Sequence, residues 1–276
     1  MKGKFIFLFS ILFIHFGYSQ IWVNDINEAR KLAKATNKLL LMDLNAVWCE
    51  PCRKMQTEYL NNPQYKNTLD KFILVSVDID NDRNTAAQYG IRTIPNLLIT
   101  DIKGNSIFNK SGYVNAKSTD DDLSGFPAST RDLYNLLDFE NPKKPTDEEL
   151  LSLGSSYQAL LQISKNTNAK EAFRKLSDES FIKSKKVSQN KNYIEKADIS
   201  IIYNDVLLNK TKKVFKNLDA SKITPENQSF AYYVLAQAYF IEGKKDQALQ
   251  AIEEINKQGK EEWLANAKLL SKKYEK

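Results

Sequence analysis

The amino-acid sequence is poor in the residues that most metal sites and hydrolases require. Its 276 residues include one histidine and two cysteines, and only two residues separate Cys49 from Cys52. Two cysteines are too few for a four-cysteine zinc site, an iron–sulfur cluster or a disulfide-rich scaffold. Hydrophobic residues make up 42% and charged residues 27% of the chain, which indicates a globular protein rather than a disordered or fibrous one.

The apolar run at the N-terminus is too short for a membrane anchor. Lys2 and Lys4 precede an apolar run over residues 5–16, and Ser19 then supplies a small residue for cleavage. As a helix this run would rise about 18 Å, against the roughly 30 Å of a bilayer's hydrocarbon core. We therefore expect residues 1–19 to be a secretory signal peptide. The protein would then be exported to the periplasm or cell envelope of a bacterium, with membrane contact only through this segment.

Removal of the signal peptide would also remove His15, which is the only histidine. A chain without histidine cannot run a Ser-His or Cys-His hydrolase mechanism or build a histidine-containing zinc site. What remains is the chemistry of the Cys-X-X-Cys pair in an exported protein. No cofactor is expected, because the dithiol itself carries the electrons.

Residues 20–140 alternate short apolar runs with helical patterns, which predicts an α/β sandwich with a mixed sheet. Strands are expected at 39–44, 72–79, 96–100 and 106–109, and helices at 25–37, from the cysteine pair to about 60, 85–89 and 131–139. The polar stretch 117–130 contains three consecutive aspartates and is interpreted as an exposed loop.

The composition changes at residues 141–146, where two prolines in a charged stretch indicate a linker. Residues 147–276 are predicted to form an all-α domain that opens with a capping box, Thr146 and Glu149. Helical patterns cover 147–164, 168–182, 191–217, 225–241, 244–257 and 260–274. The net charge is −2 over 20–140 and +6 over 141–276, which a lysine-rich helix surface explains. The lack of arginine–aromatic interleaving argues against a nucleic-acid partner.

The segment Trp-Cys-Glu-Pro-Cys at 48–52 follows a buried strand and begins a helix. A helix N-terminus carries partial positive charge and free N–H groups, so it stabilises a thiolate. Cys49 is expected to face solvent and attack, and Cys52, about one turn inside, to resolve the mixed disulfide. Pro51 suits the first helical turn. The second half of a zinc ribbon is absent, and a purely structural disulfide would close too short a loop to stabilise the fold much.

The sequence around this pair resembles the thioredoxin superfamily. The resemblance rests on Leu-Met-Asp-Leu-Asn-Ala-Val-Trp-Cys-Glu-Pro-Cys at 41–52, on Asp-Ile-Asp at 78–80, on Tyr-Gly-Ile-Arg-Thr-Ile-Pro-Asn-Leu-Leu-Ile at 89–99 and on Lys-Ser-Gly at 110–112. It spans about 22–140. The Cys-X-X-Cys-Arg-Lys-Met run and the helix after it are especially similar to periplasmic thioredoxin-like domains of the disulfide-reductant pathway. The resemblance implies an α/β thioredoxin fold, followed here by an all-α helical-repeat domain.

The resemblance also implies a role for each site residue. Cys49 would be the attacking thiolate, Cys52 the resolving thiol and Asp43 the buried acid that relays the proton of Cys52. Burial at the end of a strand would raise the pKa of Asp43, whereas an exposed Asp43 is the alternative. Residues expected to meet the substrate are Trp48, Glu50, Pro51, Ile94 and Pro95. Pro95 would be a cis-proline facing the disulfide, Ile94 resembles the reducing members, and Trp48 would flank the site or pack in the core.

Two positions depart from the family pattern. Ser76 stands where many thioredoxins have a lysine paired with the buried acid, so protonation of Asp43 would be easier and its relay weaker. Glu50 replaces the usual glycine, and a carboxylate beside Cys49 opposes the thiolate. The second departure favours a reducing site over an oxidising one.

Residues 229–262 follow the spacing of a tetratricopeptide repeat, a helix–turn–helix of roughly 34 residues. The matching positions are Tyr232, Leu235, Ala236, Tyr239, Gly243, Ala248, Ile252 and Ile255. Lys260 replaces the proline that usually ends the repeat, and 260–274 would form a capping helix. Such repeats offer concave surfaces to protein partners. The alternative is a helical appendage that stabilises the protein without binding anything.

Three functions are compatible with the sequence. The first is an exported thiol–disulfide oxidoreductase that reduces protein disulfides, with a helical domain that binds a partner or selects the substrate. The second is an oxidase or isomerase that acts on proteins folding in the envelope. The third is a non-catalytic peptide-binding or assembly module in which the cysteine pair is incidental.

Overall fold

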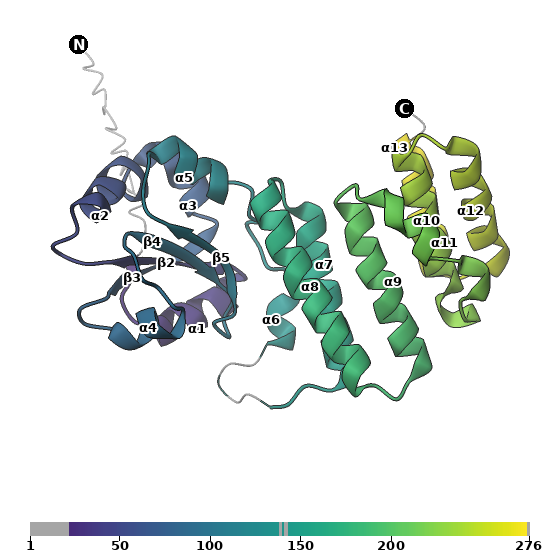
Figure 1. Ribbon diagram of the computed structural model, residues 1–276, viewed down its shortest axis with the longest axis horizontal. Coiled ribbons are helices and arrows are strands. Elements are labelled where there is room, and N and C mark those ends of the chain that lie inside the picture. Colours follow the sequence, from purple (N-terminus) through teal and green to yellow (C-terminus); the bar gives the residue numbers. More distant parts are fainter. Residues whose placement is uncertain (1–21, 138–139, 141–142, 275–276) are drawn as a thin grey trace, which may run out of the picture.

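The computed structural model describes residues 22–137, 140 and 143–274 (Figure 1). The predicted signal peptide and part of the predicted linker therefore lie outside the described residues. Among the helices that are described, none is both long and apolar enough to cross a membrane.

A five-stranded sheet forms the centre of the first half, in the order β1-β3-β2-β4-β5. Strands β1, β3 and β2 are parallel, whereas β4 runs antiparallel to β2 and β5 antiparallel to β4. The strands are β1 (Trp22–Val23), β2 (Leu39–Asn45), β3 (Phe72–Asp78), β4 (Asn96–Thr100) and β5 (Ser106–Ser111). The predicted mixed sheet is confirmed, with β1 as an additional two-residue edge strand.

Helices cover the sheet, as the predicted α/β sandwich requires (Figure 1). They are α1 (Ile26–Thr36), α2 (Glu50–Met55), α3 (Lys66–Leu69), α4 (Arg83–Gln88), α5 (Ala116–Leu123) and α6 (Leu133–Leu136). A π-helical turn, Gln56–Leu60, continues α2, and a 3₁₀ turn, Pro63–Tyr65, precedes α3. The last predicted helix of this half, 131–139, is reduced to α6 in its described part.

The interpretation of residues 117–130 as an exposed loop is wrong, because their first part belongs to α5. Asn115 caps this helix by accepting a hydrogen bond from the N–H of Ser118 at 2.8 Å. Thr119 and Leu123, four residues apart, are fully buried on its inner face. The three consecutive aspartates lie between these two positions, where Asp121 is exposed and Asp120 and Asp122 are partly buried. The polar residues therefore belong to a helix and not to a loop.

The second half is all-α, as predicted (Figure 1). Its helices are α7 (Asp147–Ile163), α8 (Thr167–Val187), α9 (Lys191–Leu207), α10 (Val214–Asn217), α11 (Pro225–Ile241), α12 (Lys245–Gln258) and α13 (Glu261–Tyr274), with 3₁₀ turns at Thr211–Lys213 and Ala220–Lys222. The capping box at the start of α7 is confirmed, since Thr146 and Glu149 bond to each other's backbone N–H.

A single helix over 191–217 is wrong, because α9 ends at Leu207. Asn209 then adopts a left-handed backbone with φ of 58°. Asparagine tolerates this conformation better than most residues, so it can end a helix where glycine is absent. The chain continues through a 3₁₀ turn into the short helix α10.

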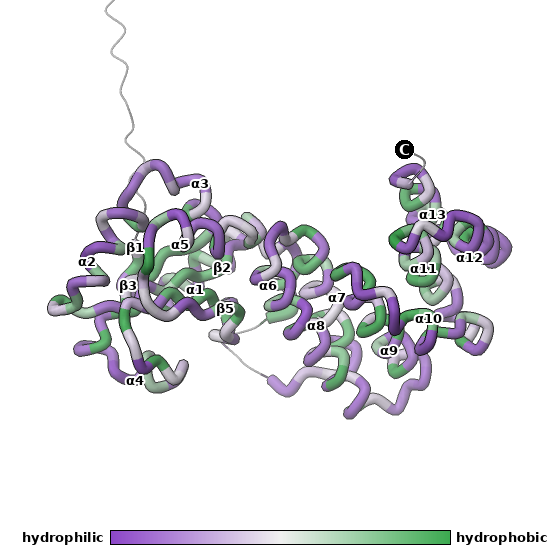
Figure 2. The backbone as a smooth tube through the Cα atoms, turned by 45° about the horizontal axis from the view of Figure 1, so that its top comes forward, coloured by the Kyte–Doolittle hydropathy of each residue, from purple (hydrophilic) through white to green (hydrophobic). Residues whose placement is uncertain are grey.

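Helices α11 and α12 form the helix pair that the tetratricopeptide spacing predicts. Ala236 and Ala248 are both fully buried, and Gly243 turns the chain between the helices with φ of 71°. Helix α13 packs against the pair, where Trp263 stacks on Phe230 with 5.0 Å between ring centroids. In Figure 2, α12 carries mostly hydrophilic positions, because only one of its faces packs against α11 and α13.

The hydrophobic core of the sheet continues into α7 and α8. Tyr157, Leu160 and Phe173 belong to the same cluster of buried side chains as strands β2 to β4. The hydroxyl of Tyr157 donates to Oδ2 of Asp101, just after β4, at 2.8 Å. Figure 1 shows α7 and α8 beside β5, on the side of the sheet away from α2. The two halves are therefore packed directly against each other.

Candidate redox site

The two cysteines lie where β2 leads into α2 and form a disulfide with an S–S distance of 1.99 Å. Cys49 is the N-cap residue of α2, and its Sγ accepts a hydrogen bond from the backbone N–H of Cys52 at 3.1 Å. Pro51 and Glu50 occupy the exposed first turn of this helix. The helix N-terminus thus directs the backbone N–H of Cys52 at Cys49 Sγ, which is the arrangement that stabilises a thiolate.

The expectation that Cys49 faces solvent is wrong for this disulfide form. Cys49 is 3% exposed and Cys52 1%, so exposure does not distinguish them. Ala46 is buried with them, and Ile79 and Ile94 pack against this small cluster. The two cysteines differ instead in their position on α2, because Cys49 is the N-cap residue and Cys52 lies in the first turn.

Asp43 is buried on β2, next to the site. It is 1% exposed, so the exposed alternative is wrong. Burial raises the pKa of Asp43 to about 6, although hydrogen bonds from Gln56 and Asn45 oppose the rise. A carboxyl group with this pKa can accept or donate a proton near neutral pH. The structure thus supplies a proton-exchanging group beside the cysteine pair.

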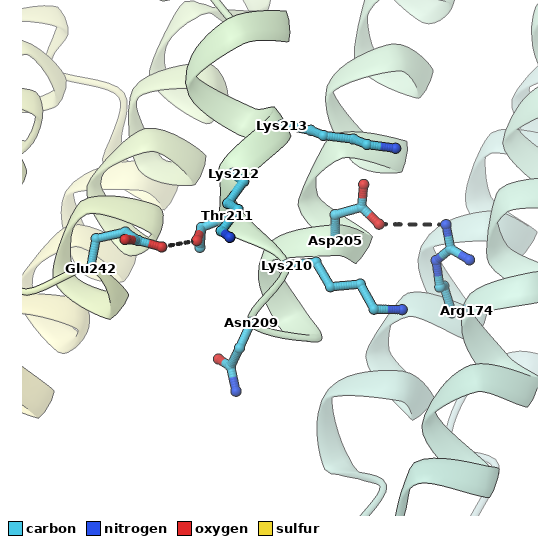
Figure 3. A pocket seen from close by; sticks show the side chains of 8 residues that line it. All are labelled: Arg174, Asp205, Asn209, Lys210, Thr211, Lys212, Lys213 and Glu242. Carbon is cyan, nitrogen blue, oxygen red and sulfur yellow. Dashed lines mark hydrogen bonds and ion pairs between the residues drawn. The ribbon is translucent and has the colours of Figure 1, made fainter.

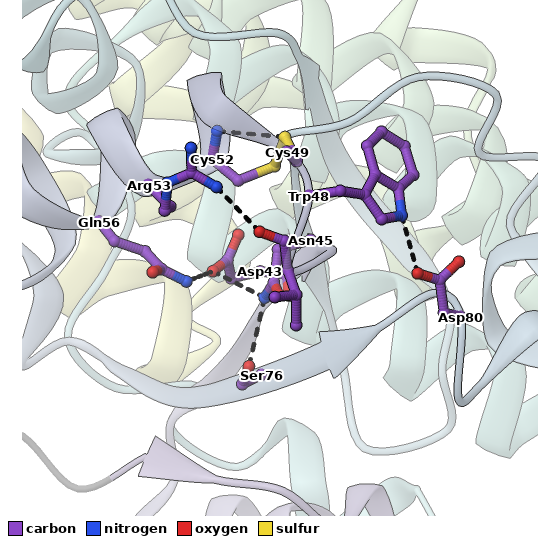
Figure 4. The surroundings of a disulfide bond; sticks show 10 residues. Asp43, Asn45, Trp48, Cys49, Cys52, Arg53, Gln56, Ser76 and Asp80 are labelled. Carbon is purple, nitrogen blue, oxygen red and sulfur yellow. Dashed lines mark hydrogen bonds between the residues drawn. A yellow bond between two sulfur atoms is a disulfide. The ribbon is translucent and has the colours of Figure 1, made fainter.

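Two side-chain amides hold the Asp43 carboxyl group (Figure 4). Asn45 Nδ2 donates to Asp43 Oδ2 at 3.1 Å, and Gln56 Nε2 donates to the same oxygen at 3.3 Å. Asn45 Nδ2 also lies 3.2 Å from Ser76 Oγ on β3. A neutral network therefore occupies the region where the family resemblance places a lysine. Sequence reasoning missed both amides, although Asn45 shares a strand face with Asp43 and Gln56 follows Cys52 by one helical turn.

Trp48 lies on the surface beside the disulfide and not in the core. Trp48 is 66% exposed, and its Nε1 donates to Asp80 Oδ2 at 2.8 Å (Figure 4). Asp80 follows β3, and sequence reasoning gave it no role. The neighbouring Val47 is 81% exposed. An apolar surface therefore flanks Cys49 and is held in part by a hydrogen bond.

The Ile94–Pro95 peptide bond is cis, which confirms the conformation that the family resemblance implies. Ile94 packs against the cysteine cluster, and the carbonyl oxygen of Pro95 accepts a hydrogen bond from the N–H of Gly112 at 2.8 Å. Sequence positions 43, 49, 52 and 94 thus come together at one end of β2. The substrate-binding roles of Ile94 and Pro95 stay predictions.

Residues 26–123 match the profile of a family described as a thioredoxin-like domain. The match covers strands β2 to β5, the cysteine pair and the cis-proline. Residues 26–123 therefore form a thioredoxin-like domain. With its paired cysteines, this domain supports thiol–disulfide oxidoreductase activity, and the all-α second half lies outside the match.

Three curated relatives are similar to the thioredoxin-like domain. Thioredoxin H4 of Arabidopsis thaliana is 27% identical over 33% of this chain and 71% of its own. The thiol:disulfide interchange protein DsbD of Cronobacter sakazakii is 28% identical over 37% of this chain and 19% of its own. The TPR repeat-containing thioredoxin TDX of Arabidopsis thaliana is 31% identical over 26% of this chain and 18% of its own. Thioredoxins of Brassica species are matched over 57% of their length.

The helical half carries a separate, cation-rich pocket of about 530 Å³ (Figure 3). Its lining residues are Arg174, Asp205, Asn209, Lys210, Thr211, Lys212, Lys213 and Glu242. Arg174 pairs with Asp205 at 3.4 Å, and Lys210 pairs with Glu171 at 2.7 Å. The pocket thus has four cationic and two acidic side chains in its lining, and it lies beside the chain reversal after α9.

Proposed function

We propose that this protein is an exported thiol–disulfide oxidoreductase that reduces protein disulfides through Cys49 and Cys52, with no cofactor beyond the dithiol. The observation that supports it best is the placement of Cys49 at the N-cap of α2 with the buried Asp43 beside the pair. The relatives named as thioredoxins and as a thiol:disulfide interchange protein support the same chemistry.

In the proposed reaction, the Cys49 thiolate attacks one sulfur of a substrate disulfide, and the other substrate sulfur leaves as a thiolate that takes a proton. Cys52 then transfers its S–H proton to Asp43, and its thiolate attacks Cys49 Sγ in the mixed disulfide. The Cys49–Cys52 bond forms, the bond to the substrate breaks, and the second substrate thiol leaves. The substrate gains two electrons and the protein ends as the disulfide.

The reducing direction is supported by two residues. Glu50 places a carboxylate in the exposed first turn of α2, where it opposes the thiolate of Cys49 and so disfavours a strongly oxidising site. Ile94, before the cis-proline, resembles the reducing members of the family. A redox titration against glutathione tests this direction. A reduction potential of about −270 mV for the cysteine pair supports a reductase, whereas one of about −120 mV would establish an oxidase instead.

A trapping experiment tests the redox role itself. The Cys52→Ala variant keeps the attacking thiol but cannot resolve, so it should accumulate mixed disulfides with envelope proteins, visible on non-reducing gels. The matched Cys49→Ser variant should trap none. If the protein is instead a non-catalytic assembly module, Cys52→Ala will trap nothing and Cys49→Ser will keep the full cellular function.

Export is the second part of the proposal, and it rests on the basic and apolar pattern of residues 1–19. Expression of the full chain in a bacterium should give a periplasmic protein whose N-terminus, read by mass spectrometry, begins at Gln20. An intact Met1 on a cytoplasmic protein would contradict export without affecting the redox chemistry.

The helical half is proposed to bind an acidic segment of a protein partner at the cation-rich pocket. Lys212 and Lys213 line this pocket, and no acidic partner for either is found among the described residues. Fluorescence anisotropy with a labelled glutamate-rich peptide tests this. Lys212→Glu/Lys213→Glu should lose binding about tenfold or more, because charge reversal replaces attraction by repulsion. The matched control, Lys183→Glu/Lys186→Glu on the exposed side of α8, should not. An equal loss of peptide affinity in both variants would show that binding depends on net charge alone and would contradict binding at the pocket.

A further inference from the structure

The two oxygens of the Asp43 carboxyl group have different surroundings. Oδ2 accepts the amide N–H groups of Asn45 and Gln56, at 3.1 and 3.3 Å. Oδ1 is fully buried and has no hydrogen-bond partner among the described residues. Buried polar atoms are paired in the great majority of cases, so an orphaned carboxyl oxygen needs an explanation.

The amides decide which oxygen can carry a proton. Each N–H group that points at Oδ2 needs a lone pair there, so a proton on Oδ2 would face two donors. The proton of the neutral acid is therefore held on Oδ1. Figure 4 shows the carboxyl group beneath the disulfide, with the oxygen that Gln56 does not contact directed toward the cysteines.

The two donors come from different elements and so fix the acid relative to the cysteines. Asn45 is the last residue of β2, and its Nδ2 also contacts the carbonyl oxygen of Asp43 at 3.0 Å and Ser76 on β3. Gln56 begins the π-helical turn one turn after Cys52, on the continuation of the same helix. The helix that carries the resolving thiol therefore also carries a donor to the acid.

No charged side chain among the described residues competes with these amides at Asp43. The neighbours of Asp43 in the sheet, Ser76 on β3 and Leu97 on β4, are uncharged. On the helix side, Arg53 is exposed and donates to the carbonyl oxygen of Val47 at 2.9 Å. Cys52 also lies on the helix side, and it is held in the disulfide.

We propose that Gln56 and Asn45 are positioning residues that occupy Oδ2 of Asp43 and so reserve Oδ1 for proton exchange with Cys52. The proposal deepens the proposed function, on which it rests for the resolving step. In that step the Cys52 S–H proton moves to Oδ1, the Cys52 thiolate attacks Cys49 Sγ, and the substrate sulfur leaves with the electron pair of the broken bond. The amides give up no proton and keep the acid in place.

The test uses Gln56→Leu in the full-length mature protein, in its reduced state. Loss of a donor to the charged form should raise the pKa of Asp43, measured by carbon NMR of labelled aspartate, by about half to one unit. The single-turnover rate of mixed-disulfide resolution should then fall about two- to fivefold at pH 6 and match the unaltered protein at pH 9. Gln64→Leu, at an exposed glutamine of the same half, is the control and should change neither quantity.

Asn45→Ala provides a second variant, in case Gln56→Leu does not fold, and it should shift the pKa of Asp43 in the same direction. An unchanged Asp43 pKa and pH profile in a folded variant would overturn the proposal. A rate loss that is equal at pH 6 and pH 9 would show damage to the fold instead, and would also overturn it. Because the NMR measurement needs no turnover, a protein with shifted pKa values but no reductase activity would refute the proposed function alone.

Discussion

At the residue scale, burial of Asp43 lowers the stability of the fold at neutral pH and also gives the site a group that can exchange a proton there. A carboxyl group buried in a sheet is held partly protonated near pH 6, because burial disfavours its charged form more than the hydrogen bonds from Gln56 and Asn45 favour it. The sequence predicts the cysteine pair from its spacing, and it predicts Asp43 through the resemblance to the thioredoxin superfamily. It does not predict Gln56, Asn45 or Asp80, because amides and acids occur widely on surfaces and only the folded geometry gives them a partner.

The burial of Asp43 makes stability depend on pH. Its pKa rises from 3.8 to about 6 on folding, so the folded state binds the proton more tightly and loses stability as the pH rises through this window. Above pH 6, Asp43→Asn should therefore have a larger free energy of unfolding than the unaltered protein, by at most about 3 kcal/mol, and should unfold at a higher denaturant concentration. Below pH 4 the gain should vanish.

Urea titrations at several pH values measure this difference. Asp132→Asn, at an exposed aspartate, serves as the control and should show no such window. A stability gain in Asp43→Asn of equal size at pH 4 and pH 8 would contradict the assignment to the buried proton.

At the element scale, apolar periodicity predicts the strands and most helices, and it fails where local polarity is ambiguous. Helix α5 buries Thr119 and Leu123 and has three consecutive aspartates between them, so its composition resembles a loop. The end of α9 depends on one left-handed residue, Asn209, in a stretch whose other residues favour a helix. The two-residue strand β1 is too short to leave a pattern at all.

The contact between α7 and α8 depends on the absence of a side chain at Gly154. A Cβ there would lie 2.6 Å from the ring of Phe181, which is fully buried. Gly154→Ala gains helix propensity of about 1 kcal/mol but forces this ring to move, which costs about 1–3 kcal/mol in a packed core. We expect a net loss of stability in urea denaturation.

Ser156→Ala on the same helix is the matched control for propensity and should not destabilise the protein. A Gly154→Ala variant that is more stable than the unaltered protein would show that Phe181 relaxes without cost.

At the scale of the whole molecule, the composition break and the packing do not coincide. The prolines near residue 142 predict a linker, yet Leu160, Leu161 and Phe173 complete the core of the sheet from beyond it. Asn166, the N-cap of α8, also donates to the carbonyl oxygens of Asp121 and Asp122 at 2.8 and 2.9 Å. Sequence patterns describe each segment separately, so a core that two segments share has no local signature.

Truncation tests this shared core. A fragment of residues 22–146 removes the α7 and α8 side chains, and it should lose cooperative unfolding or aggregate, because the exposed surface is apolar. A fragment of residues 22–210 keeps them and should retain the protection of β2 amides in hydrogen exchange. Equal protection in both fragments would contradict the role of the helices in the core.

Because α7 and α8 pack directly on the sheet, a protein partner (a client) bound at the helical half would be held at a fixed distance from the disulfide. A flexible tether would let a client bound at the helical half sample the disulfide at a concentration set by tether length. In this protein the two halves are packed together without such a tether, so the client's own chain would have to span the distance from the helical half to the disulfide. The reach of the bound client, rather than any property of the enzyme's linker, would then decide which of its disulfides is reduced first.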